Sequence, residues 1–157
     1  WNVVERLESF YDLELWVLGE GELQNDLAFI IEHHNIHSIE MLGFQDNPYP
    51  YVRKADLYIC SSDFEGYSTA VTEAVALGVP VITTDCAGMD EILEDGKYGW
   101  IVENTEEGLY RGLKYLLDHP AEIEDKKKRM ENKLKNINEG YALNEYLQLF
   151  QEVVKWK

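Results

Sequence analysis

Short apolar runs alternate with helix-forming stretches along this chain, and the alternation limits what it can fold into. Five runs have the character of buried strands, at residues 13–19, 39–44, 56–62, 80–85 and 100–102. The intervals between them carry apolar residues at helical spacing or good helix formers. Strands that alternate with helices are typical of an α/β domain built on a parallel sheet. The last and shortest run is expected at the edge of that sheet.

The predicted helices are bounded by residues that start and stop helices. Ser68 or Thr69 caps one helix, and Gly78 followed by Pro80 ends it. An Asn or Thr at 104–105 caps a later one. The predicted helical segments are residues 3–11, 23–35, 51–55, 69–77, 87–95, 104–119, 121–135 and 141–157, and a loop is predicted at 45–50.

The charge of the chain argues against several classes of function. Its 157 residues suit one domain. Thirty Asp and Glu against 14 Lys and Arg give a net charge of -16, which repels nucleic acid and anionic membranes. The basic run at 125–135 follows acidic residues four positions earlier, so we expect a solvated helix face with ion pairs. Neither a long apolar span nor a signal peptide is recognised, so we expect a cytoplasmic protein.

The loops that follow the strands are the place to look for a site. In parallel α/β sheets, ligands bind outside the carboxyl ends of the strands. The loops after Gly19, Gly43, Ser62 and Asp85 are therefore expected to lie at one edge.

One of these loops combines a glycine turn with a capped helix start. Glu65 and Gly66 follow a strand, and a helix begins two or three residues later. The first amides of a helix have no partner within it and carry a partial positive charge. Gly66 lets a ligand approach the main chain closely. This predicts an anion site for a diphosphate at the amides near Ser68, Thr69 and Ala70, which needs few basic side chains.

Two carboxylates flank this predicted anion site. Glu73, one turn into the helix, can accept two hydrogen bonds from a cis-diol such as ribose hydroxyls. Glu65 can accept hydrogen bonds from the hydroxyls of a sugar beyond the phosphates. The pattern does not assign acid and base roles to them. The alternative is structural, because glutamates near helix starts are common and favourable to the helix dipole.

The stretch from residue 55 to residue 102 resembles the C-terminal domain of retaining glycosyltransferases of family four, which have the two-domain GT-B architecture. Residues 16–22 and 41–56 also resemble earlier strands and loops of that family. The residues that match its pattern are Glu65, Gly66, Glu73, Ala74, Gly78, Pro80, Asp85, Gly88, Glu91, Ile92, Asp95, Gly96 and Gly99.

The resemblance implies a Rossmann-like parallel sheet flanked by helices, forming the C-terminal half of a GT-B enzyme that binds a UDP- or GDP-sugar. Glu73 would hold the ribose hydroxyls, and Glu65, the implied catalytic residue, would hold the donor sugar. The implied donor-binding residues are Glu65, Gly66, Tyr67, Ser68, Thr69, Ala70 and Glu73. The implied pocket for the base and ribose consists of Gly19, Gly21, Phe44, Gln45 and Glu73.

Some features of the family pattern are absent from this sequence. The family's diphosphate-binding Arg and Lys follow a first strand that would precede Trp1. The chain does not begin with Met, so we expect residues 1–157 to be a single nucleotide-sugar-binding domain, excised from a longer protein and inactive alone. The acceptor, a sugar or lipid, would bind an absent N-terminal domain. There is no Asp-x-Asp motif, and Cys60 and Cys86 lack metal-ligand spacing, so we expect no metal and no cofactor.

Two alternative functions stay open from the sequence. One is a sugar-nucleotide epimerase of the same architecture, and the other is a non-catalytic flavodoxin-like binding module. The loop at residues 47–51 resembles that of bacterial family members that build surface polysaccharides. The resemblance implies a parent enzyme of that synthesis, peripheral on the inner face of the membrane.

Overall fold

The computed structural model describes residues 1–137 of the chain, and the side chains of residues 1–131. The predicted helix at 141–157 lies outside the described residues. The helices are α1 (Asn2–Glu8), α2 (Gln24–His34), α3 (Tyr49–Lys54), α4 (Thr69–Ala76), α5 (Met89–Ile92), α6 (Glu106–Asp118) and α7 (Pro120–Ile137). The strands are β1 (Leu15–Leu18), β2 (Ile39–Gly43), β3 (Tyr58–Cys60), β4 (Val81–Thr84) and β5 (Gly99–Val102).

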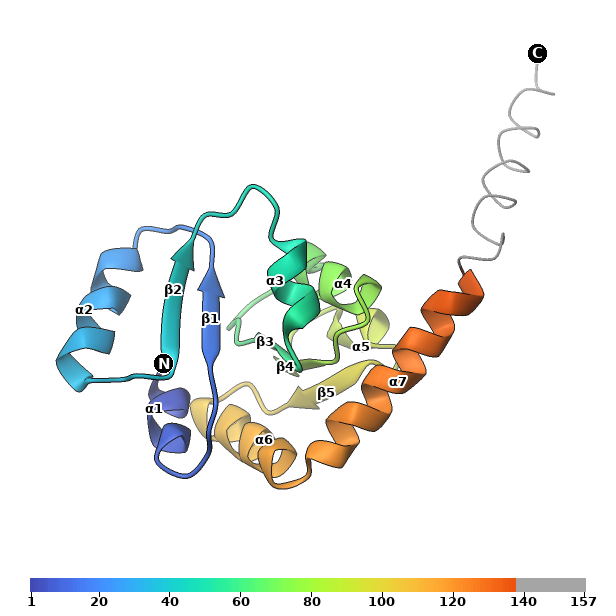
Figure 1. Cartoon of the computed structure of the whole chain (residues 1–157). Coiled ribbons are helices and arrows are strands. Elements are labelled where there is room, and N and C mark those ends of the chain that lie inside the picture. Colours follow the sequence, from blue (N-terminus) through green and yellow to red (C-terminus); the bar gives the residue numbers. More distant parts are fainter. Residues whose placement is uncertain (138–157) are drawn as a thin grey trace, which may run out of the picture.

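The strands pair in parallel, as the alternation of strands and helices predicts (Figure 1). The prediction of an α/β fold with parallel strands flanked by helices is confirmed. The strands form two sheets, however, where one was expected. Within the described part of the chain, β1 pairs only with β2, and β3, β4 and β5 form a separate sheet in that order. We call them the small sheet and the large sheet.

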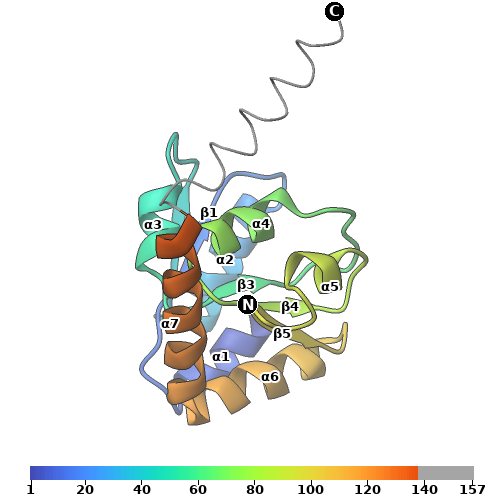
Figure 2. The ribbon, with the colours of Figure 1, turned by 90° about the vertical axis from the view of Figure 1, so that its right-hand side faces the viewer.

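The large sheet lies at the centre of the main core. All four residues of β4 are buried, because strands pair with it on both sides and helices cover both faces. One face packs against α4 and α5, through a cluster that includes Val71, Val81 and Met89. The other face packs against α6 and α1, through Ile82, Leu113 and Leu7. Figure 2 shows α1 and α6 on the side of this sheet away from α4.

The helix between β3 and β4 begins and ends where the sequence predicts. The Ser68 side chain accepts a hydrogen bond from the Val71 amide and caps α4. Gly78 adopts a left-handed conformation with φ of 80° just beyond the helix. A residue with a Cβ is strained at that angle, which is why glycine followed by Pro80 ends the helix there.

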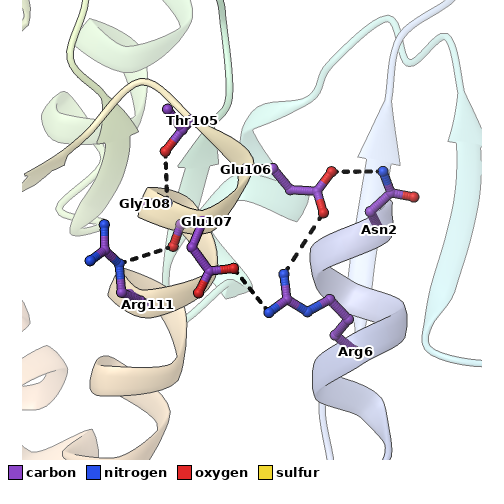
Figure 3. A network of polar contacts seen from close by, with 7 residues as sticks. All are labelled: Asn2, Arg6, Thr105, Glu106, Glu107, Gly108 and Arg111. Atoms are coloured by element: carbon purple, nitrogen blue, oxygen red, sulfur yellow. Dashed lines mark hydrogen bonds and ion pairs between the residues drawn. The ribbon is translucent and has the colours of Figure 1, made fainter.

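Helix α1 is held on α6 by charged and polar side chains (Figure 3). Asn2 donates to the Glu106 carboxylate over 2.8 Å, and Arg6 pairs with both Glu106 and Glu107. The Arg6 guanidinium also lies 3.6 Å from the centre of the Tyr110 ring. Leu7 of the same helix is buried in the large-sheet core. The polar contacts with α6 and the burial of Leu7 together hold α1 in place.

Two predictions for helices need correction. Helix α3 begins at Tyr49, within the segment predicted as a loop, because proline is tolerated in a first helical turn. The basic run of α7 is not wholly solvated. The Asp125–Arg129 ion pair is present, but the Lys126 ammonium donates to the Gly96 carbonyl and lies over an indole ring. Partial burial lowers the pKa of Lys126 below its usual range. The hydrogen bond to Gly96 and the contact with the Trp100 ring dock the helix.

Candidate functional site

The loops after β1 and β2 lie together, as expected for neighbouring parallel strands. The Gly19 amide donates to the Gly43 carbonyl over 2.8 Å. Gly19 and Gly43 have φ angles of 110° and 65°, where glycine is favoured. Gly21 is exposed, and a Cβ placed on it would meet no atom within 4 Å. Space therefore exists beside this part of the predicted base pocket.

The two residues predicted to wall the base differ in availability. Phe44 is 63% exposed, so its ring is free to face a planar ligand. The Gln45 side chain donates instead to the Leu42 carbonyl over 2.8 Å. That bond ties Gln45 to the end of its own strand, and only its remaining polar groups are available to a ligand.

The start of α4 has the features of an anion site. Ser68 is buried and supplies the cap, while Thr69 and Ala70 are exposed. The amides of these two residues belong to the first turn, where the helix supplies no acceptor. No acidic residue occupies the first turn of α4, so nothing there neutralises the partial positive charge of the helix. Tyr67, just before the cap, is 60% exposed.

Glu65 lies at the turn before this helix and has a side-chain partner. The Ser62 hydroxyl donates to one carboxylate oxygen of Glu65 over 2.8 Å. Glu65 is half-buried, and Gly66 beside it is exposed. The bond leaves one carboxylate oxygen for a ligand and restricts the rotamers of the glutamate.

Glu73 has a partner that the sequence analysis did not anticipate. The Tyr49 hydroxyl, at the start of α3, donates to a Glu73 carboxylate oxygen over 3.2 Å. This hydrogen bond to the carboxylate raises the pKa of Tyr49, because the bond and the nearby negative charge favour the neutral phenol. Tyr49 is 45% exposed and Glu73 is exposed, so both can contact a ligand. A tyrosine beside prolines in a loop after a strand was the only signal in the sequence.

The predicted residues thus fall into two groups joined by α3. Gly19 and Gly43 belong to the small-sheet side, and Glu65 and Glu73 belong to the large-sheet side. Tyr49 bonds Glu73, and Tyr51 of the same helix makes an edge-on ring contact with Trp16 of β1. Helix α3 therefore holds the two groups in one arrangement.

A separate hollow of about 360 Å³ lies against β5 and α6. None of the predicted site residues lines it. Its lining residues are Trp100, Ile101, Val102, Glu103, Gly108, Arg111, Gly112, Tyr115 and Leu116.

Among the described residues, no group of three or more His, Cys, Asp or Glu side chains is arranged to hold a metal ion. Within that same part of the chain, none of the helices combines the length and apolar character that a membrane span requires.

Residues 2–137 match the family described as glycosyl transferases group 1. The chain belongs to this family. Because the match runs through both sheets, the loops described above occupy positions of a glycosyltransferase domain, and the family prediction is confirmed.

Curated relatives of the chain include proteins named as bacterial glycosyltransferases. The chain is 36% identical over 110 residues to N-acetylgalactosamine-N,N'-diacetylbacillosaminyl-diphospho-undecaprenol 4-alpha-N-acetylgalactosaminyltransferase of Campylobacter jejuni, covering 68% of this chain and 30% of the relative. It is 35% identical over 103 residues to the putative colanic acid biosynthesis glycosyltransferase WcaL of Salmonella typhimurium, covering 59% of this chain and 25% of the relative.

Solved structures agree on the fold. A variant of TarM from S. aureus, in complex with fondaparinux, α-GlcNAc-glycerol and UDP, superposes with a TM-score of 0.76 at 21% identity. The superposition covers 96% of this chain and 31% of that one. The chain therefore spans between 25% and 31% of the length of these three proteins. The fold prediction of a GT-B half is confirmed.

Proposed function

We propose that this chain is the donor-binding part of a glycosyltransferase that uses a nucleoside diphosphate sugar. The observation that carries the proposal is the start of α4. Its capped but uncharged first turn opens beside Gly66, with Glu65 before it and Glu73 one turn beyond. Backbone amides that can bind an anion are thereby flanked by two carboxylates that can accept hydrogen bonds from hydroxyls. This arrangement matches a diphosphate that lies between two sugars.

The diphosphate meets the exposed amides of Thr69 and Ala70 in this proposal. The partial charge of the helix then stabilises the negative charge that grows on the leaving phosphate as the sugar bond breaks. Backbone groups suit this task because they are already oriented and do not reorganise during the reaction. We place the basic residues that complete the phosphate site in a part of the protein outside this chain.

The two glutamates divide the sugars between them. Glu73 accepts hydrogen bonds from the ribose, held in orientation by Tyr49 on one oxygen. Glu65 accepts from the transferred sugar with the oxygen that Ser62 leaves free. Gly19, Gly21, Phe44 and Gln45 border the base, with the exposed Phe44 ring as its stacking surface.

The relatives support a role in glycan assembly. One is named for transfer to a diphospho-undecaprenol-linked sugar and another for colanic acid biosynthesis, while TarM was solved with UDP. We therefore propose a UDP- or GDP-sugar donor, retention of configuration, and an acceptor sugar or lipid of bacterial surface polysaccharide synthesis. In this proposal the acceptor binds another domain, the isolated chain does not transfer sugar, no metal takes part, and the parent works at the cytoplasmic face of the membrane.

The division of the strands into two sheets supports the proposal that the domain continues outside this chain. Within residues 1–137, β1 and β3 are edge strands with one neighbour each, as are β2 and β5 at the opposite edges of the two sheets. Strand edges with unpaired backbone groups favour the addition of a strand. We propose that a further parallel strand joins β1 to β3 and that residues 1–157 together with it form one nucleotide-sugar-binding domain.

Calorimetry and kinetics on the full-length enzyme test the two glutamates. Glu73→Gln removes a charge-assisted hydrogen bond of about 1.5–3 kcal/mol, so UDP or GDP alone binds roughly 10- to 150-fold more weakly. Glu65→Gln leaves the affinity for free nucleotide unchanged and lowers turnover with the intact donor. Glu124→Gln, a change on α7 away from the site, serves as the control.

The outcomes separate this function from the others. Equal nucleotide affinity of wild type and Glu73→Gln refutes the ribose assignment. Tight binding of a flavin without binding of either nucleotide refutes the transferase and supports a flavodoxin-like module. Interconversion of the donor sugar without transfer supports an epimerase. Transfer that is lost on adding EDTA and restored by Mg²⁺ contradicts metal independence.

A further inference from the structure

The loop that carries Glu65 is fastened from two neighbouring strands. The Ser62 carbonyl accepts hydrogen bonds from the Thr84 hydroxyl over 2.6 Å and from the Cys86 thiol over 3.1 Å. Thr84 ends β4, and its side chain is almost fully buried. The hydroxyl of the same Ser62 donates to Glu65. Ser62 therefore links the buried Thr84 hydroxyl on β4 to the Glu65 carboxylate.

A second fastening comes from the end of β5. The Asn104 side-chain amide donates to the Asp63 carbonyl over 2.9 Å and also contacts the Cys86 sulfur at 3.6 Å. Asn104 is 41 residues away from Asp63 in sequence. Two successive carbonyls of one loop are thus bonded by side chains from two other strand ends.

The turn itself is supported from behind by a glycine. Gly88, before α5, has a φ of 82°, and a Cβ on it would lie 2.8 Å from the Gly66 carbonyl oxygen. The backbone of the β4–α5 loop therefore abuts the turn that follows Glu65. Hydrogen bonds on one side and backbone contact on the other leave the turn little room to shift.

We propose that Thr84 and Asn104 are positioning residues for sugar transfer, because they hold the Ser62–Asp63 backbone at the place where Glu65 meets the donor sugar. This inference rests on the proposed role of Glu65. Neither residue touches substrate; each acts through the loop. A loop held in advance does not have to be ordered when the donor binds, and small displacements of a reacting group are costly to rate.

The chain offers a matched pair of threonines for the test. Thr83, the preceding residue of β4, is also fully buried, but its hydroxyl donates to the Thr84 carbonyl within the strand. Thr84→Val and Thr83→Val each keep the shape of the side chain and delete one buried hydroxyl. Only Thr84→Val removes a hydrogen bond to the loop, so the two variants separate a positioning role from a general loss of stability.

The test measures kcat/KM and nucleotide affinity of the full-length enzyme with a UDP- or GDP-sugar as donor. Thr84→Val lowers kcat/KM for the intact donor about 10-fold, a tenth of the loss that a displacement of about 1 Å can cause. Its affinity for free nucleotide stays at the wild-type value, because Glu65 does not contact the nucleotide. Thr83→Val keeps wild-type kcat/KM, although both variants unfold at a lower temperature.

A second variant, Asn104→Asp, and a double-mutant cycle with Glu65→Gln test the proposal even if Thr84→Val does not fold. Asn104→Asp keeps the size of the side chain but replaces its donor with an acceptor facing the Asp63 carbonyl. It lowers kcat/KM in the wild-type background and has little further effect in Glu65→Gln enzyme, because residues that act through a common group are not additive.

The failures are distinguishable. If wild-type enzyme neither binds nucleotide nor transfers sugar, the proposed function is wrong. If wild-type enzyme is active and Thr84→Val matches Thr83→Val in kcat/KM, the positioning role is wrong. Effects of Asn104→Asp that multiply fully with those of Glu65→Gln also overturn it, since Asn104 would then act independently of the glutamate.

Discussion

The small sheet and the large sheet differ in how deeply their strands are buried. Every residue of β4 in the large sheet is buried, whereas every residue of β1 in the small sheet is only half-buried. Helix α2, which joins β1 to β2, has no buried residue, and its Phe29 is 66% exposed. Parallel strands are ordinarily covered on both faces, so the small sheet departs from the usual pattern.

The difference in burial indicates that the two sheets contribute unequally to the stability of this domain. The large sheet has helices on both faces and two core clusters of buried residues. Among the residues whose side chains are described, the small sheet has a cluster of only three buried residues, Val4, Ile36 and Ile39. We infer that the large sheet stabilises the fold and carries the proposed phosphate and sugar side of the site, while the small sheet carries the proposed base side on a less stable support.

Alanine at a glycine position gives the largest expected contrast. In Gly99→Ala, on β5, the new Cβ would press on the Val81 carbonyl oxygen of the neighbouring strand. Backbone cannot move aside as a side chain can, so unfolding free energy falls by about 3 kcal/mol. In Gly21→Ala, after β1, the Cβ meets nothing, and stability changes by less than about 1 kcal/mol. Urea unfolding measures both, and equal losses would contradict the contrast.

Two valines compare the sheets by the same chemical change. Val81 in β4 is fully buried, and Val17 in β1 is half-buried. Val81→Ala removes two buried methyl groups and leaves a cavity, at a cost of about 2–3 kcal/mol. Val17→Ala costs about 1 kcal/mol, because part of that surface already faces water. A larger loss for Val17→Ala in urea unfolding would show that the small sheet is the better packed of the two.

Tyr49→Phe tests the link between the two sides of the site. Losing the hydrogen bond of about 1 kcal/mol to Glu73 weakens nucleotide binding roughly 5-fold by calorimetry. Tyr115→Phe is the matched control, because Tyr115 is similarly exposed and also bonds a glutamate, Glu122, at the α6–α7 junction. Unchanged or tighter binding by Tyr49→Phe would mean that Tyr49 does not orient Glu73 for the ribose.

Glu8 gives the smallest effect and a dependence on pH. Its carboxylate accepts from the Ser38 hydroxyl and from the amides of His37 and Ser38, which ties α1 to the start of β2. The Ser38 hydroxyl bond above all lowers the pKa of Glu8 below its ordinary 4.5, despite partial desolvation. Its stabilisation is therefore complete above pH 4.5 and is lost as the pH falls through the lower folded-state pKa.

The measurement for Glu8 is urea unfolding at several pH values. Glu8→Gln is less stable than wild type near neutral pH, and the gap narrows in acid. Glu14→Gln, which changes an exposed carboxylate before β1, stays close to wild type throughout. A gap for Glu8→Gln that is constant down to pH 3 would rule out the carboxylate bonds as its cause.

Much of the fold could be predicted because its signals are local. Alternating apolar runs placed all five strands within a few residues, and the cap at Ser68 and the stop at Gly78 were visible in the chain itself. The start of α3 was misplaced, since a proline fits a loop and a first helical turn equally well. The division into two sheets was missed, because strand order depends on distant pairings that no local pattern records.

The candidate site divides in the same way. Glu65, Gly66, Ser68 and Glu73 stand close together in the sequence, and their roles followed from a turn, a cap and a helix start. Their roles stay predictions, to be tested by the variants above.

The sequence by itself determined the α/β class and the family pattern, and it predicted the position of an anion site, because turns, caps and helix starts are specified by neighbouring residues. Only the tertiary structure decided that Tyr49 meets Glu73 and that Thr84 and Asn104 hold the Glu65 loop. These contacts join residues 22 to 41 positions apart, where the chain path, and not propensity, sets the distance. Hydrogen bonds between such residues depend on how the strands and helices pack, which is the information that a single sequence does not display.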